Sequence, residues 1–225
     1  MRTVKDRLRE QDKCVEKVSQ ESSRQREDGF AVVAIGASAG GPSALERVFS
    51  RLPGRLPAAL VVSQHMPNGF TKAFAGRLAA VSGLQVREAQ NGDVLQAGNV
   101  FITPGGHNME IADGRIRLQK AEETPSPSID VMMKSVADAY GSRSVGVLMT
   151  GMLTDGVHGM KAIKEHGGVT IAQDESSSLV FGMNKAAVEA GVVDEVAHVS
   201  VMADRIVNTL PGTPCCRKHG STSNG

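Results

Sequence analysis

The chain has 225 residues, with 25 Lys and Arg against 24 Asp and Glu, and its formal net charge is +1 at neutral pH. Apolar residues make up 40% of it and charged residues 22%, a composition typical of globular proteins. This balance argues against a nucleic-acid-binding surface, and one tyrosine with no tryptophan leaves few rings for base stacking. No apolar stretch approaches the roughly 20 residues that span a bilayer. We therefore expect neither nucleic acid nor membrane insertion.

The two ends of the chain differ in composition from its middle. Fifteen of the first 28 residues are charged, which predicts a charged linker or short helix over 1–28 rather than a secretory signal. Residues 211–225 have the composition of a disordered tail. We expect one globular domain over 29–210. The cysteines all lie in the end segments, an odd count typical of free thiols in the cytoplasm. They are Cys14, Cys215 and Cys216.

Short apolar runs alternate with helical patterns in the first half of the middle region. Continuous apolar runs are typical of strands in buried parallel sheets, and Pro42 stands where the first turn of a helix tolerates proline. The sequence predicts strands over 30–35, 58–63, 84–88 and 100–103, and helices over 43–52 and 70–80.

The second half adds a hairpin to this alternation. Two alternating runs within 109–120 flank Asp113 and Gly114, a pair that favours a two-residue hairpin turn. Ser128 is expected to cap a helix that Gly141 ends. Beyond it we expect strands over 145–149 and 169–172 and helices over 157–166, 184–190 and 200–210. The order predicts an α/β fold with a doubly wound, mostly parallel (Rossmann-like) sheet and an inserted β-hairpin.

Three strand ends carry polar side chains of complementary chemistry. Ser38, His65 and Asp155 each follow a predicted strand, and ligands of an open parallel sheet bind at the carboxyl ends of its strands. Together they are the inventory of a serine nucleophile, its base and the carboxylate that orients the base. Taken singly, His65 has a structural alternative as a hydrogen-bonded polar residue, and Asp155 as a cap of the helix that starts at Gly156.

The glycine-rich string around the serine allows a second interpretation. Residues 36–40 (GASAG) fit a strand-to-helix turn that exposes a serine hydroxyl, and equally a dinucleotide-binding turn. A dinucleotide fold places Asp or Glu at the end of its second strand to hold the ribose. Here that strand ends in Ser63, Gln64 and His65, which favours the serine hydrolase.

Several strings resemble the catalytic domain of the chemotaxis protein-glutamate methylesterases, the CheB-type family. The resemblance covers about residues 30–210, and its motifs occur in the family's order. They are VAIGASAGGP at 33–42, QHMPNGFT at 64–71, GDVL at 92–95, PSID at 127–130, GM at 151–152 with DG at 155–156, and IAQDE with VFGM between 171 and 183.

The resemblance implies hydrolysis of γ-glutamyl methyl esters on the signalling helices of chemoreceptors, together with deamidation of receptor glutamines. It gives Ser38 the role of nucleophile, His65 that of general base and then acid, and Asp155 that of orienting acid. The backbone N–H of Met152 is implied to stabilise the oxyanion. Ala39 and Gly40, at the start of the helix after Ser38, are expected beside it, because a helix N-terminus attracts negative charge.

The resemblance also bears on cofactors and partners. It implies that no metal or cofactor is required. The implied partners are methyl-accepting chemotaxis receptors, with a chemosensory methyltransferase or array proteins as further ones. A non-catalytic adaptor that keeps the fold and binds receptors is the alternative function. A pure binding module has no need of the complete set of three side chains, so the sequence favours the enzyme.

The chain departs from the family pattern at several positions. Ala39 stands where threonine is frequent and Asn184 where proline is common. Leu153 replaces a frequent glycine, which would reshape the oxyanion loop if a positive φ is needed there. Family members usually carry a phosphorylatable receiver domain, which 28 residues cannot form. The sequence therefore predicts a stand-alone catalytic domain that is active without phosphorylation.

Overall fold

The computed structural model describes residues 29–122 and 125–211. The expected N-terminal linker, the tail after residue 211 and all three cysteines lie outside these residues. The strands are β1 (Ala31–Ala37), β2 (Ala58–Gln64), β3 (Gln85–Glu88), β4 (Asn99–Ile102), β5 (His107–Ala112), β6 (Arg115–Lys120), β7 (Ser144–Leu148), β8 (Val169–Gln173) and β9 (Glu195–Ala197). The helices are α2 (Gly41–Phe49), α3 (Thr71–Val81), α4 (Ile129–Tyr140), α5 (Val157–Glu165), α6 (Met183–Glu189) and α7 (Met202–Thr209), and a 3₁₀ turn (Gly141–Arg143) follows α4.

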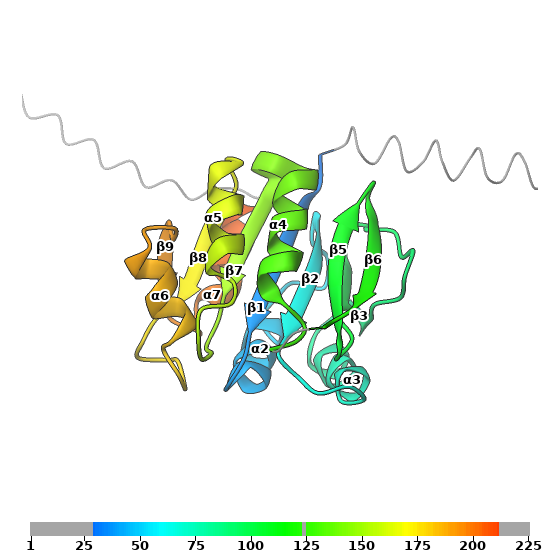
Figure 1. Ribbon diagram of the computed structural model, residues 1–225, viewed down its shortest axis with the longest axis horizontal. Coiled ribbons are helices and arrows are strands. Elements are labelled where there is room, and N and C mark those ends of the chain that lie inside the picture. Colours follow the sequence, from blue (N-terminus) through cyan, green and yellow to red (C-terminus); the bar gives the residue numbers. More distant parts are fainter. Residues whose placement is uncertain (1–28, 123–124, 212–225) are drawn as a thin grey trace, which may run out of the picture.

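Seven strands form one parallel sheet in the order β3-β4-β2-β1-β7-β8-β9. The arrowheads of the central strands point to one edge, the lower edge in Figure 1. The chain winds from β1 to one side through β2 and to the other through β7, so the order reverses at β1 and β7. The predicted doubly wound parallel sheet is confirmed.

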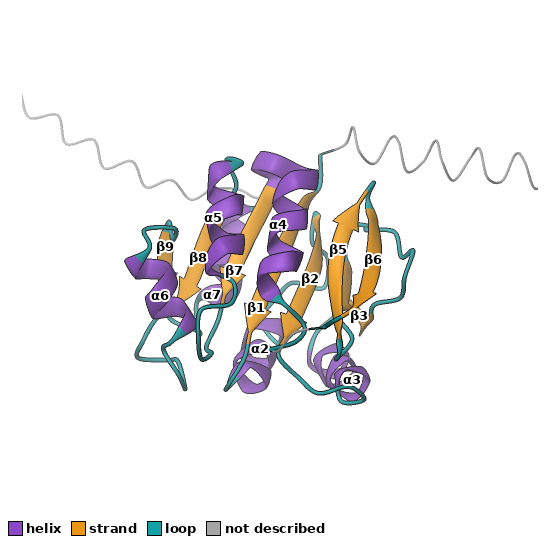
Figure 2. Ribbon diagram, viewed as in Figure 1, coloured by secondary structure: helices purple, strands orange, loops and turns teal. Residues whose placement is uncertain are grey.

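Both faces of the sheet are covered by helices, as Figure 2 shows. Side chains of β1 alternate between the two cores: Val33 and Ile35 pack with α2, α3 and α7, whereas Val32 and Ala34 pack with α4, α5 and α6. Every residue of β1 is buried. A central strand buried on both faces has the continuous apolar run that the sequence displays.

The hairpin of β5 and β6 stands apart from the main sheet as a separate two-stranded sheet. Its turn residues, Asp113 and Gly114, have φ values of 54° and 70°. A two-residue turn of this hand matches the twist of the strands, and Asp and Gly tolerate it. The hairpin lies against α4, where the hydroxyl of Ser135 accepts a 2.9 Å hydrogen bond from the N–H of Ile111. The predicted inserted hairpin is confirmed.

The predicted elements differ from the observed ones mainly at their ends. Ser128 caps α4 and accepts a hydrogen bond from the N–H of Val131, as expected. Strand β9 was not predicted, because its three residues are too few to form a recognisable apolar pattern and its Val196 is 49% exposed. None of the described helices has the length and apolar character needed to cross a membrane.

Candidate active site

The carboxyl ends of β1, β2 and β7 meet where the strand order reverses. Ser38 directly follows β1, His65 directly follows β2, and Asp155 lies in the loop between β7 and α5. Because β2, β1 and β7 are neighbours in the sheet, their following loops are neighbours too. This is the place at which a doubly wound sheet binds its ligands.

The three side chains form one hydrogen-bonded chain. The Oγ of Ser38 lies 3.0 Å from Nδ1 of His65, and Nε2 of His65 lies 2.8 Å from Oδ2 of Asp155. An ionised carboxylate only accepts, so Nε2 carries the hydrogen and Nδ1 is the acceptor that faces the serine hydroxyl. The arrangement can move a proton from Ser38 to His65 while Asp155 holds the ring.

Asp155 is held by the N-terminus of α4 as well as by His65. Its Oδ2 accepts from the N–H of Ile129 at 2.8 Å, and its Oδ1 accepts from the N–H of Asp130 at 3.0 Å and from the hydroxyl of Ser128 at 3.3 Å. Burial raises the pKa of Asp155, but the hydrogen bonds from His65, Ile129 and Asp130 outweigh it and leave the pKa below its ordinary value. The carboxylate is therefore charged at neutral pH.

The Asp130 carboxylate in turn accepts hydrogen bonds from the start of α5, the helix that follows Asp155. Its Oδ1 accepts from the N–H groups of Gly156 at 3.0 Å and Gly159 at 2.6 Å. The sequence alternative that Asp155 caps the helix beginning at Gly156 is thus wrong: Asp155 accepts from the first N–H groups of α4, and Asp130 accepts from those at the start of α5. Nδ1 of His158 lies 3.1 Å from the other oxygen of this carboxylate, Oδ2 of Asp130. The two helix starts are locked to each other around the carboxylate.

The turn that carries Ser38 is fixed by its backbone. The N–H of Ser38 donates to the carbonyl of Thr150 at 3.0 Å, and its carbonyl accepts from the N–H of Gly41 at 2.8 Å. Gly40 has a φ of 80°, and a β-carbon there would come within 2.6 Å of Cβ of Leu179. Glycine is required for both reasons. The hydroxyl of Thr150 donates to the carbonyl of Ala39 at 2.9 Å and ties the turn to the loop after β7.

The N–H groups expected to bind the oxyanion belong to the turn after Ser38 and to the loop after β7. The N–H groups of Ala39, Gly40 and Met152 make no hydrogen bond to any described residue. Met152 is 55% exposed, and Leu153 has a φ of 68°. The position where the resemblance makes glycine frequent therefore does adopt a positive φ here, with leucine in a conformation that favours glycine.

Two cavities flank the hydrogen-bonded chain. One of about 320 Å³ lies beside the nucleophile turn, lined by Gly40, Thr150 and Leu179 among others. The second, of about 740 Å³, lies behind Asp155, between the hairpin and the starts of α4 and α5. Within 29–122 and 125–211, no three His, Cys, Asp or Glu side chains gather closely enough to hold a metal ion.

Comparison with known proteins assigns the chain to a family. The family model described as CheB methylesterase matches residues 33–206. The chain belongs to this family. The crystal structure of the Thermotoga maritima CheB methylesterase catalytic domain matches with a TM-score of 0.75 at 36% identity, over 79% of this chain and 97% of that one.

Curated relatives carry the name protein-glutamate methylesterase/protein-glutamine glutaminase. The one from Geobacter sulfurreducens, numbered 3, is 46% identical over 197 residues, which is 84% of this chain and 53% of that protein. The one from Moorella thermoacetica is 46% identical over 194 residues, 83% of this chain and 46% of that protein. The chain therefore spans about half the length of the curated relatives it matches.

Proposed function

We propose that this protein is a serine hydrolase that cleaves glutamate γ-methyl esters on methyl-accepting chemotaxis receptors, and that residues 29–210 form its catalytic domain. The observation that carries the proposal is the hydrogen-bonded chain from Ser38 through His65 to Asp155 at the reversal point of the sheet. Membership of the CheB methylesterase family supports the ester as substrate. A cytoplasmic location belongs to the same proposal and rests on the positions of the cysteines in the sequence.

In the first half of the reaction, Oγ of Ser38 attacks the ester carbonyl carbon while its proton passes to Nδ1 of His65. The negative charge of Asp155 stabilises the imidazolium that forms. The carbonyl oxygen becomes an oxyanion, which the N–H groups of Ala39, Gly40 and Met152 bind in this proposal; their lack of a partner among the described residues supports it. The bond to the methoxy oxygen then breaks, and His65 donates its proton so that methanol leaves.

In the second half, water attacks the glutamyl ester of Ser38 and gives a proton to Nδ1 of His65. The bond to Oγ breaks, the proton returns to Ser38, and the glutamic acid side chain departs and releases its remaining proton to water. A glutamine side chain follows the same route with ammonia as the leaving group, which accounts for a glutaminase activity in the same site.

The surface around the site supports a protein as the substrate. Four large apolar side chains that are 55–76% exposed lie in the loops that follow β2, β7 and β8. They are Phe70, Met152, Leu153 and Leu179. Because the methyl ester itself is small, binding energy must come from contacts remote from it. We therefore expect free glutamate γ-methyl ester to be a far poorer substrate than a methylated receptor.

The decisive experiment measures methanol release from a methylated receptor by the unchanged protein and by Ser38→Ala, His65→Ala and the double variant. Each single change should lower turnover by about 10⁴-fold or more, and the double change should add little, because the two groups act as a unit. Ser82→Ala is the matched control, since among the described residues its hydroxyl bonds only the carbonyl of Leu78 at the end of α3.

Labelling with a fluorophosphonate probe separates the enzyme from the adaptor. The enzyme should be labelled at Ser38 and lose labelling in His65→Ala, whereas a non-catalytic adaptor would not react. Methanol release by Ser38→Ala at the rate of the unchanged protein would overturn the proposed mechanism, and equal efficiency on the free ester would overturn the receptor as the preferred substrate.

A further inference from the structure

A buried side-chain amide joins the main chain of Ser38 to that of His65. Gln64, the last residue of β2, is 2% exposed. Its Nε2 donates to the carbonyl of Ser38 at 2.9 Å and to the carbonyl of His65 at 3.0 Å. We propose that Gln64 is a positioning residue that sets the separation of Ser38 and His65. This inference rests on the proposed function, in which that separation governs the first proton transfer.

The orientation of the amide follows from its neighbours. Carbonyl oxygens only accept hydrogen bonds, so the NH₂ group must face the carbonyls of Ser38 and His65. The opposite orientation would place three oxygen atoms together. The remaining atom, Oε1 of Gln64, is then buried and has no hydrogen-bond partner among the described residues. A buried acceptor without a partner lowers the stability of the fold. The presence of Gln64 despite this cost indicates that the two hydrogen bonds donated by its NH₂ group matter to the protein.

Gly41 provides the space for this amide. A β-carbon on Gly41 would collide with Oε1 of Gln64 and would lie 2.8 Å from Cβ of Ala37 and 2.9 Å from Cδ of Gln64. Gly41 is the first residue of α2 and, unlike Gly40, has no positive φ that would call for glycine. In a helix, alanine is otherwise the more favourable residue. The amide of Gln64, which would be the nearest obstacle, therefore explains together with Ala37 why glycine stands at this position.

The Gln64 amide connects the chains after β1 and β2 at the point where backbone pairing between the two strands has ended. Strand pairing ends with Ala37 beside Gln64, and the last ladder bond runs from the N–H of His65 to the carbonyl of Ala37 at 3.0 Å. Beyond it Ser38 enters a turn toward α2, while His65 enters a loop toward α3. Across this divergence, the two bonds from Gln64 fix the 3.0 Å distance between Oγ and Nδ1.

The first test replaces Gln64 by methionine, which has a similar length and no donor. We expect kcat for receptor demethylation to fall about 100-fold, the loss that a misplacement of about 1 Å can cause, with KM unchanged. The rate of fluorophosphonate labelling of Ser38 should fall by a similar factor. A purely structural role would lower the midpoint of thermal unfolding and leave kcat of the folded protein unchanged.

The second test keeps Gln64 and adds a β-carbon in the space that its side-chain amide occupies. Gly41→Ala should lower the labelling rate by at least 10-fold, because the added β-carbon displaces the amide. Gly76→Ala is the matched control: Gly76 is also helical, in α3, and nothing lies within 4 Å of an added β-carbon there. The control should label at the rate of the unchanged protein. If Gln64→Met does not fold, Gly41→Ala alone decides.

Folded Gln64→Met with an unchanged kcat and labelling rate would overturn the inference, as would an unchanged labelling rate in Gly41→Ala. Because labelling needs no receptor, the two proposals can fail separately. Gln64-dependent labelling without demethylation of receptors would support the positioning role and overturn the proposed substrate. Absence of labelling in the unchanged protein would overturn both.

Discussion

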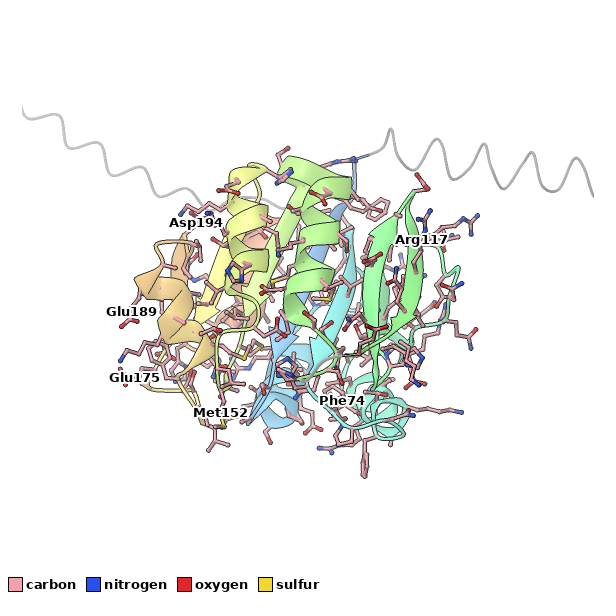
Figure 3. All side chains as sticks on the ribbon, in the orientation of Figure 1. Phe74, Arg117, Met152, Glu175, Glu189 and Asp194 are labelled. Atoms are coloured by element: carbon pink, nitrogen blue, oxygen red, sulfur yellow. The ribbon has the colours of Figure 1, made fainter. Side chains whose placement is uncertain are left out.

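The two sides of Ser38 are held in different ways. On the base side, the side chains of His65 and Asp155 are 9% and 13% exposed. Four donors, from His65, Ile129, Asp130 and Ser128, converge on the Asp155 carboxylate. The oxyanion side consists of the turn after Ser38 and the loop after β7, whose exposed Met152 lies at the lower edge of the molecule in Figure 3.

This difference fits the order of events in the proposed reaction. The base side must hold one protonation pattern before any substrate arrives, and a rigid set of donors does so at no cost during the reaction. The oxyanion side has no charge to hold until the tetrahedral intermediate forms. Its N–H groups stay unpaired with the described residues, ready for an oxygen supplied by the substrate. Changes on the base side should therefore have the larger effects on kcat.

The largest effect is expected for Asp155→Asn. Asparagine has one accepting oxygen where Asp155 uses two, one toward His65 and Ile129 and the other toward Asp130. With its oxygen toward Asp130, its NH₂ group faces Nε2 of His65, so the ring takes the tautomer that presents N–H to Ser38. A base of the wrong tautomer should lower kcat by about 10⁴-fold, as in other serine triads. Loss of one bond to α4 should lower the free energy of unfolding by about 1 kcal/mol. Steady-state kinetics and urea unfolding measure the two effects.

Asp194→Asn is the matched control for this change. Asp194 also has a pKa below its ordinary value, and its Oδ2 accepts from the N–H and the hydroxyl of Thr170. It lies toward the edge of the molecule opposite Met152 (Figure 3). Its replacement should lower stability and leave kcat unchanged. Similar kinetics in the two variants would show that the base side owes its effect to stability alone.

The pH dependence of stability should be the next largest effect. The pKa of Asp155 in the folded protein lies below its ordinary value, so the charged carboxylate stabilises the fold. This contribution is complete above the unfolded pKa of about 4 and is lost as the pH falls through the lower folded value. The free energy of unfolding should therefore fall more steeply below about pH 4 in the unchanged protein than in Asp155→Asn. Urea titrations between pH 3 and 7 measure it, and parallel curves would contradict it.

The comparison also separates what the sequence could predict from what it could not. Apolar runs and the glycine turn predicted the parallel sheet, and the order of the strands brings Ser38, His65 and Asp155 to one edge. These features depend on patterns local to each strand. A residue that directly follows a buried strand must lie at its carboxyl end, whatever the rest of the chain does.

The binding of Asp155 to the start of α4, and of Asp130 to the start of α5, could not be predicted in the same way. Asp155 precedes α5 by two residues, and local rules assign it to that helix. In the folded protein it binds Ile129 and Asp130, 26 and 25 residues earlier in the chain. The close approach of Gln64 to Gly41 also joins the end of β2 to the start of α2. Such pairings depend on how elements cross in space and leave no periodic signal in the sequence.

The smallest effect is expected on the oxyanion side, for Leu153→Gly. Leu153 has a φ of 68° and is 63% exposed, so the change removes strain and little buried surface. Relief of about 1 kcal/mol is offset in part by the greater freedom of glycine in the unfolded chain, and a net gain of about 0.5 kcal/mol is expected. Leu153→Asn, which tolerates a positive φ, should also stabilise, whereas Leu153→Val should destabilise. We expect kcat to change less than about threefold, far below the effect at Asp155. Thermal unfolding of the three variants measures the order, and destabilisation by glycine without destabilisation by valine would show that the side chain of Leu153, rather than its backbone, holds this loop.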